Sequence, residues 1–284
     1  MNTAVKKGAE DPVEPVDAVD QLIEQYDPES NFRRLAGLAA MFVTIVSVSL
    51  SGWHVYTAGF GLHNEIAHRA IHLSVVLGLC FLVFPRQKPL AGAWEWILPI
   101  TLGSFYILFG WWLVQALGAD LPESTALIFM ALLTAVALLT LPIKALDGSH
   151  TSIPIRDWFF AAISSGFSLY LLVFFDEIYI QRPGDHSNLD YMVGVFSIVM
   201  VVEVTRRTMG IFLPLLAVGV VLYGIFGPYL PGDLAHRGYS VPRVIAHLYK
   251  GTEGIYGIPV GVVATFVFHF VLFGIMAQLT GLGQ

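Results

Sequence analysis

The sequence predicts an all-α, polytopic integral membrane protein with about eight transmembrane helices. Eight long apolar runs divide the chain, and most reach the roughly 20 residues that a helix needs to cross a hydrocarbon core of about 30 Å. Apolar residues make up 56% of the 284 residues and charged residues only 13%, against roughly 45–50% and 25% in soluble domains. So much apolar surface excludes an ordinary soluble protein.

Polar connectors separate the eight runs. Because backbone polar groups must be paired within the segment in lipid, each run is expected to be a helix. The sixth run is shorter than a full crossing requires. In chain order the runs are Leu35–Tyr56, Ile66–Phe84, Trp94–Ala116, Ser124–Ile143, Trp158–Phe175, Tyr191–Thr205, Ile211–Tyr229 and Ile258–Leu279.

The first 30 residues are predicted to be a cytoplasmic acidic tail. Residues 9–30 hold eight acidic residues and no Lys or Arg, which indicates a solvated segment and not an acidic active site. Apolar residues recur at helical spacing from Val16 to Tyr26, so a short amphipathic helix is expected there, ended by Pro28. We expect this helix to contact cytoplasmic loops of the same protein. No cleavable signal peptide is apparent, since the first apolar run follows this acidic stretch.

The distribution of Lys and Arg predicts the orientation. Cytoplasmic loops of membrane proteins carry an excess of these residues. A cytoplasmic N-terminus places ten of the fifteen inside: Lys6, Lys7, Arg33, Arg34, Arg86, Lys88, Lys144, Arg156, Arg206 and Arg207. Five then lie outside: Arg69, Arg182, Arg237, Arg243 and Lys250. We therefore expect an even number of crossings, with Arg33, Arg34, Arg206 and Arg207 as topology anchors.

Residues 230–257 are too polar to span a membrane but carry a helical pattern. Five apolar residues follow the spacing of a helix with one apolar face: Val241, Val244, Ile245, Leu248 and Tyr249. Ser240 is placed to cap this helix, and Pro242 falls in its first turn. The pattern predicts an interfacial helix that leads into the last span.

Histidines form one candidate site. His68 and His72 are four residues apart on the second span, and His54 and His63 precede them, so a metal or haem site is conceivable. The simpler interpretation is that all four are polar residues at the outer interface, because no carboxylate-rich set accompanies them. His269 differs, since it falls near the middle of the last span, where ionisable residues are costly and often mark a polar pathway or an interhelical hydrogen bond.

No catalytic pattern emerges from the remaining polar residues. Asp176 and Glu177 end the fifth span, where water is expected to reach them. Glu203 precedes Arg206 and Arg207 at ion-pair spacing near another span end, where water is expected to reach its carboxylate as well. Cys80 is the single cysteine and is expected to pack as a small hydrophobe, so a disulfide within the chain is excluded. We predict neither an enzyme nor a metal site.

The run TEGIYGIPVG, from Thr252 to Gly261, precedes the last span. Glycine and proline interruptions at membrane depth are typical of the discontinuous helices of transporters. A flexible start to an ordinary helix is the alternative. On the first interpretation, a substrate pathway would involve Thr252, Glu253, Gly254, Gly257, Pro259 and His269.

Several segments together resemble one family of transporters. They are YDPESNFRRLAG (26–37), WHVYTAGFG (53–61), HRAIHL (68–73), EVTRR (203–207), GPYLPG (227–232), HRGYS (236–240) and TEGIYGIP (252–259). In these segments the chain resembles the fused permeases of TRAP transporters of the TAXI type, in which the small and large membrane subunits form one chain. The resemblance covers nearly the whole chain from Tyr26 and places it at the N-terminal portion of such a permease.

The resemblance implies a function and a division of the chain. These permeases are secondary transporters that import organic anions, typically carboxylates, by symport with sodium across the bacterial inner membrane. A periplasmic substrate-binding protein delivers the substrate. Residues 31–185 would be a small-subunit-like membrane scaffold, and residues 186–284 the start of the large-subunit-like transport region.

Several expected parts of this machinery have no counterpart in the sequence. The Gly/Ser-rich hairpin segments of the family do not occur in this sequence, so substrate and sodium residues are expected beyond Gln284. The chain is therefore expected to be incomplete alone, with the remaining transport region of the same permease as a partner. Two alternatives stay open. One is a membrane redox protein that binds haem through His54, His68 or His72; the other is a membrane scaffold that stands alone.

Overall fold

The computed structural model describes residues 32–62, 64–86, 123–141 and 152–282, together with isolated residues between 100 and 115. Its elements are helices, and no strand occurs among the residues described, so the predicted all-α class is confirmed. The predicted amphipathic helix at 16–26 and most of the third predicted span lie outside these residues.

Five of the described helices are long and apolar enough to cross a membrane. They are α2 (Gly37–Phe60), α3 (Glu65–Val83), α7 (Asn188–Met209), α8 (Phe212–Phe226, continued by η5, Gly227–Tyr229) and the last helix, Ile258–Leu279. The fourth and fifth predicted spans form helices α5 (Glu123–Thr140) and α6 (Ile155–Val173), which do not meet the same criteria. A membrane-embedded helical protein is thus supported, with five spanning helices described.

Helices α3, α6 and α7 form the core. Phe81, Phe160 and Phe196 come from these three helices and are at most 2% exposed. Small residues allow close approach between α3 and α6, because a Cβ at Gly78 would lie 2.6 Å from Ser165 Oγ. Ser74 and Ser165 also exchange hydrogen bonds, each hydroxyl donating to the other's carbonyl at 3.1 and 2.9 Å. Cys80 packs against this core, as expected.

The span predicted from Tyr191 to Thr205 is longer in the structure than the apolar run indicated. α7 begins at a capping box, in which Ser187 Oγ accepts from the Asp190 amide and Asp190 accepts from the Ser187 amide. It continues to Met209 because Arg206 and Arg207 are paired with acidic residues inside the protein. Twelve of its residues are buried, so α7 is a central helix.

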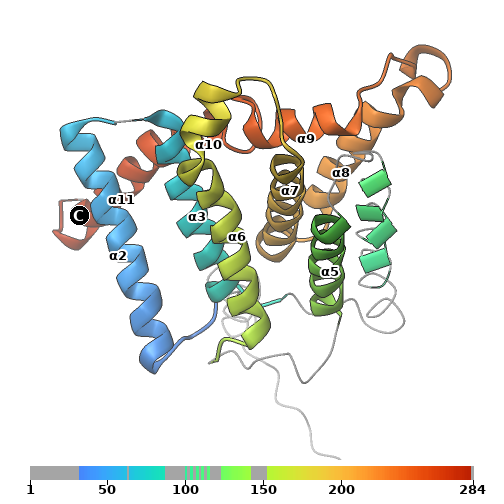
Figure 1. Ribbon diagram of the computed structural model, residues 1–284. Coiled ribbons are helices and arrows are strands. Elements are labelled where there is room, and N and C mark those ends of the chain that lie inside the picture. Colours follow the sequence, from blue (N-terminus) through green and yellow to red (C-terminus); the bar gives the residue numbers. More distant parts are fainter. Residues whose placement is uncertain are drawn as a thin grey trace, which may run out of the picture.

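The predicted interfacial helix is present as α9 (Val241–Lys250). It lies across the ends of the more upright helices (Figure 1) and packs its apolar residues Val241, Ile245 and Tyr249 inward against α7. Ser240 occupies the N-cap position and Pro242 the first turn, as predicted, although the Ser240 side chain makes no capping hydrogen bond.

The last helix is one continuous rod made of three labelled segments. These are α10 (Ile258–Val262), the π-helical segment η7 (Val263–Val267) and α11 (Phe268–Leu279). It runs obliquely across α2 and α3 (Figure 1). Ala264 is the one buried residue along its length, so this helix rests on the bundle without entering the core.

Candidate functional site

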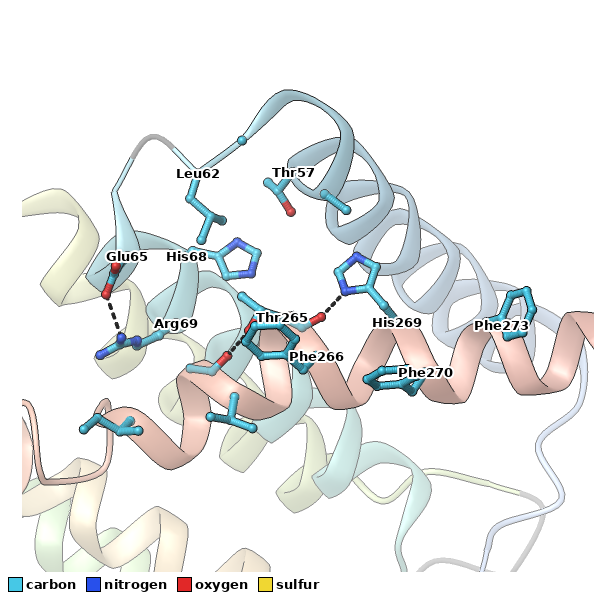
Figure 2. A pocket seen from close by; sticks show the side chains of 15 residues that line it. Thr57, Leu62, Glu65, His68, Arg69, Thr265, Phe266, His269, Phe270 and Phe273 are labelled. Carbon is cyan, nitrogen blue, oxygen red and sulfur yellow. Dashed lines mark hydrogen bonds and ion pairs between the residues drawn. The ribbon is translucent and has the colours of Figure 1, made fainter.

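A groove of about 760 Å³ lies where the last helix crosses α2 and α3 (Figure 2). Its walls come from the end of α2, the start of α3 and one face of the last helix. Polar groups of Glu65, His68 and Arg69 gather at one side, while Phe270 and Phe273 line the other part. The volume is in the range of small-molecule sites, and the mixed lining suits an elongated, amphipathic occupant.

Four histidines lie close together at this groove, namely His54, His68, His72 and His269, and His68 and His269 line it. His54, His68 and His72 are at most 5% exposed, and the His54 ring lies 4.9 Å from the ring centroids of both others. α2, α3 and the last helix enclose these three side chains, so they are buried between helices. That they lie at the level of the outer membrane interface stays a prediction. His63 lies outside the described residues. The four-residue spacing of His68 and His72 indicated that both lie on one face of α3. It did not indicate that His54, from α2, would pack against them.

The geometry of the histidine pair bears on the haem alternative. His54 Nε2 and His72 Nδ1 are hydrogen-bonded to each other at 2.9 Å. A haem held by two imidazoles needs the porphyrin ring between them, and this contact leaves no space for it. Nδ1 of His54 and Nδ1 of His68 are buried and have no hydrogen-bond partner among the residues that the structure describes. Within the same residues, no group of three or more His, Cys, Asp or Glu side chains could hold a metal ion.

His269 joins the last helix to α2. Its Nε2 lies 2.9 Å from the carbonyl oxygen of His54, and its Nδ1 contacts the carbonyl oxygen of Thr265 one turn earlier. The predicted interhelical hydrogen bond at His269 is thus present. Of the residues proposed for a substrate pathway, His269 is the one that lines the groove.

The other proposed pathway residues form a tight turn between α9 and the last helix. The Ile255 amide donates to the Leu248 carbonyl at 2.7 Å, and the Ile258 amide donates to the Thr252 carbonyl at 3.1 Å. A Cβ at Gly254 would lie 2.2 Å from the Leu248 carbonyl oxygen, so only glycine fits there. Glycine is needed at Gly257 as well, where a Cβ would lie 2.5 Å from the Thr252 carbonyl oxygen.

This turn does not interrupt the last span. The glycines end before Ile258, and helix 258–279 is continuous, with Pro259 in its first turn. The structure therefore gives a tight turn followed by an unbroken helix, in place of the discontinuous helix that the glycines suggested. Thr252 and Glu253 are exposed on the turn. A role for these residues in a substrate pathway stays a prediction.

A buried ionic cluster lies at the opposite end of the bundle. Asp157, at the start of α6, is fully buried and pairs with Arg33 and with Arg207, whose Nη1 donates to Asp157 Oδ1 at 2.7 Å. Glu203, 4% exposed, accepts from Arg207 Nε at 2.9 Å and from Arg206 Nη2 at 2.7 Å. The predicted ion pairs of Glu203 are confirmed, but the expectation that water reaches its carboxylate is wrong.

Arg33 connects this cluster to α3. Its Nη1 donates to the Leu82 carbonyl at 2.9 Å, and its backbone amide donates to the Val83 carbonyl at 2.9 Å. The start of α2, the end of α3, the start of α6 and the end of α7 therefore share one side of the protein, as the Lys/Arg distribution predicted. Arg33 and Arg207 are buried, whereas Arg34 is exposed. The side of the membrane on which they lie stays a prediction.

A second polar cluster holds α9 against α7. The Asp190 carboxylate accepts from Tyr170 Oη at 2.7 Å, from Arg182 Nη1 at 3.1 Å and from Lys250 Nζ at 3.0 Å. Lys250 Nζ also lies 2.9 Å from His186 Nδ1. Burial lowers the pKa of Lys250 from its ordinary value, and the bond to Asp190 opposes that effect. Burial and the Lys250 charge lower the pKa of His186.

Comparison with models of protein families, with curated proteins and with solved structures finds no match. The geometry of the groove and of the two polar clusters therefore carries the functional argument together with the sequence motifs.

The sequence did not indicate Asp157 or Asp190 as the centres of the two polar clusters. Each acidic residue binds partners far along the chain, Arg33 being 124 residues from Asp157 and Lys250 being 60 from Asp190. One signal was available for Asp190, since Ser187 and Asp190 have the spacing of a capping box. No local spacing connects Asp157 with Arg33.

Proposed function

We propose that this chain is the N-terminal membrane portion of a TAXI-type TRAP permease. It contributes a scaffold and the first part of the transport region of a secondary transporter, which imports organic anions such as carboxylates with sodium. It is not an enzyme. We further propose eight crossings of the bacterial inner membrane, a cytoplasmic N-terminus, and a periplasmic substrate-binding protein as the partner that delivers substrate.

The position of the shared motifs supports this proposal. Three of the four C-terminal motifs lie where the backbone is tightly constrained, and the fourth, EVTRR, supplies buried charged side chains. EVTRR supplies Glu203, Arg206 and Arg207 of the ionic cluster, and TEGIYGIP forms the turn before the last helix. GPYLPG and HRGYS fold onto each other, since a Cβ at Gly227 would lie 2.2 Å from the His236 ring, and Gly238 has a φ of +71° beside Pro228.

The main structural support for the proposal is the way in which the last helix is attached to the other helices. Three helices form a core held by a buried ionic cluster, and a separate helix follows a rigid glycine turn and rests on them across a groove. A fixed scaffold followed by a weakly attached helix is the arrangement expected where a scaffold passes into a transport region. By resemblance, the sodium and substrate residues are expected beyond Gln284.

Two experiments test the proposal. The first reads the coding DNA past codon 284. An open frame with further apolar spans and a Gly/Ser-rich segment supports the permease, whereas a stop codon with no neighbouring large-subunit gene favours a scaffold that stands alone. The second reconstitutes the full reading frame in liposomes with the binding protein encoded beside it. An inward sodium gradient should then drive uptake from a panel of labelled carboxylates, and no uptake would count against transport.

The haem alternative has its own test. The purified 284-residue chain is expected to show no Soret band after expression with added haem precursor, because His54 and His72 bond to each other. A Soret band that disappears in the His54→Ala variant would replace the permease proposal with a redox function.

A further inference from the structure

The groove between the last helix and the α2–α3 turn changes character along its length (Figure 2). Glu65 and Arg69, on the first turns of α3, lie at one end. Phe266, Phe270 and Phe273 extend along the last helix toward the other end. From Ile258 to Phe273 the helix advances about 22 Å along its own axis at roughly 1.5 Å per residue.

The polar end holds both signs of charge side by side. Arg69 Nη2 donates to Glu65 Oε2 at 2.8 Å, with the Arg69 side chain 14% exposed and the Glu65 side chain 73% exposed. The guanidinium is fixed in place, because it lies against Gly261, where a Cβ would come within 2.7 Å of Arg69 Nε. Arg69 Nη1 also approaches the Tyr256 carbonyl at 3.4 Å. The result is a positioned cation beside an accessible carboxylate.

The apolar end consists of three aromatic side chains. Phe266, Phe270 and Phe273 are 65%, 73% and 69% exposed, so they offer wide apolar surface next to the groove. Aromatic rings at such a site bury large area against an alkyl chain. A hydrocarbon chain that starts at the α2–α3 turn can follow these rings along the last helix.

We propose that this groove binds one zwitterionic phospholipid with a phosphoethanolamine headgroup. The phosphate lies at the Arg69 guanidinium, the ammonium lies at the Glu65 carboxylate, and an acyl chain follows the three phenylalanines. Charge complementarity selects a zwitterionic headgroup, because a singly anionic lipid would place its charge beside Glu65 without an ammonium to balance it. Ethanolamine fits in particular, because its primary ammonium can donate charge-assisted hydrogen bonds to the Glu65 carboxylate. The assignment is independent of the proposed transport function.

Photocrosslinking tests the proposal. The full chain carries p-benzoylphenylalanine in place of Phe270, or, as a control, in place of Leu216, an exposed residue of α8 outside the groove. Each protein is placed in vesicles of equal parts phosphatidylethanolamine and phosphatidylglycerol with the same acyl chains, and crosslinked lipid is identified by mass spectrometry. The ethanolamine-to-glycerol ratio at position 270 should exceed that at position 216 by about threefold, the scale of an accessible charge pair.

Charge variants separate headgroup recognition from general contact with lipid. Glu65→Gln should lower the ratio at position 270 to that of position 216 or below, because Arg69 then favours the anionic lipid. Asp233→Asn, on an exposed turn distant in sequence, is the matched control and should leave the ratio unchanged. Equal ratios at positions 270 and 216 would overturn the proposal, and so would an excess at position 270 that persists in Glu65→Gln.

Discussion

The two ends of the helix bundle are held together in opposite ways. At the Asp157 end, charged groups from three segments pair inside the protein: Arg33 before α2, Asp157 of α6, and Glu203 and Arg207 of α7. Arg207 also lies 4.8 Å from the centroid of the Phe81 ring on α3. At the groove end, two interhelical hydrogen bonds hold the last helix: His269 Nε2 lies 2.9 Å from the His54 carbonyl oxygen, and His68 Nε2 lies 3.4 Å from the Ala264 carbonyl oxygen. Ala264 is the one buried residue of this helix. Few buried contacts predict a low free energy of local opening.

This difference divides the protein into a frame, made of helices α3, α6 and α7, and the last helix, which is attached to it. Helices α3, α6 and α7 share an apolar core, and all three contact the ionic cluster. A displacement of one would therefore break buried charge pairs of α6 and α7 or the hydrogen bonds from Arg33 to α3. The last helix can shift across the groove with little loss of buried area. We infer that motion in this protein is concentrated between the last helix and the α2–α3 pair.

Breaking the ionic cluster should have the largest effect. Asp157→Asn leaves Arg33 and Arg207 without their shared buried carboxylate, which costs about 3–5 kcal/mol of stability. The yield of monodisperse protein in detergent, measured by fluorescence-detected size-exclusion chromatography, should fall severely. Glu253→Gln, on the exposed turn, is the control and should keep the normal yield. A normal yield for Asp157→Asn would show that the cluster does not fix the frame.

The ionic cluster also shows where sequence reasoning succeeds and fails. The pairing of Glu203 with Arg206 and Arg207 could be predicted because three- and four-residue spacings face each other on a helix. Helix α9 could be predicted from its apolar periodicity for the same reason. The bond of Arg33 to Asp157 could not, because it depends on how four separate helix ends meet.

At the groove, too, local features could be predicted from the sequence, whereas contacts between helices could not. The sequence marked His269 and the glycines of the turn as unusual, but it did not indicate that His54, His68 and His72 would be enclosed. Their burial depends on the packing of α2 against α3. The π-helical segment at 263–267 also has no local sequence signal that we recognise.

The second largest effect is expected from adding a side chain at Gly254, in the turn between α9 and the last helix. Gly254→Ala places a Cβ 2.2 Å from the Leu248 carbonyl oxygen, and backbone must move to accommodate it. The melting temperature in detergent, followed by tryptophan fluorescence, should fall by roughly 4 °C or more, as expected for a strained backbone site. Gly219→Ala, where a Cβ meets nothing within 4 Å, is the matched control and should not fall. An equal melting temperature for both variants would mean that the turn is not rigid.

The smallest expected effect is a pH dependence at the Asp190 cluster. In the folded chain the pKa of His186 lies below 6.5, the ordinary value that this histidine has in the unfolded chain. As the pH falls below 6.5, the unfolded chain therefore binds a proton at His186 more readily than the folded chain, and the free energy of unfolding decreases. Between pH 7.5 and pH 5.0 the wild-type melting temperature should therefore drop about 2 °C more than that of His186→Gln. Identical drops in the two proteins would show that His186 is not linked to folding.

The most direct test of the account compares mobility at the two ends. In a Cys80→Ser background in nanodiscs, spin labels at Phe60→Cys and Met276→Cys report on the last helix, and labels at Ile155→Cys and Met209→Cys report on the frame, all four being exposed positions. Pulsed electron–electron double resonance should give a broad distribution of distances between the two labels for the first pair and a narrow distribution for the second. Equally narrow distributions would contradict the division into a frame and a weakly attached last helix.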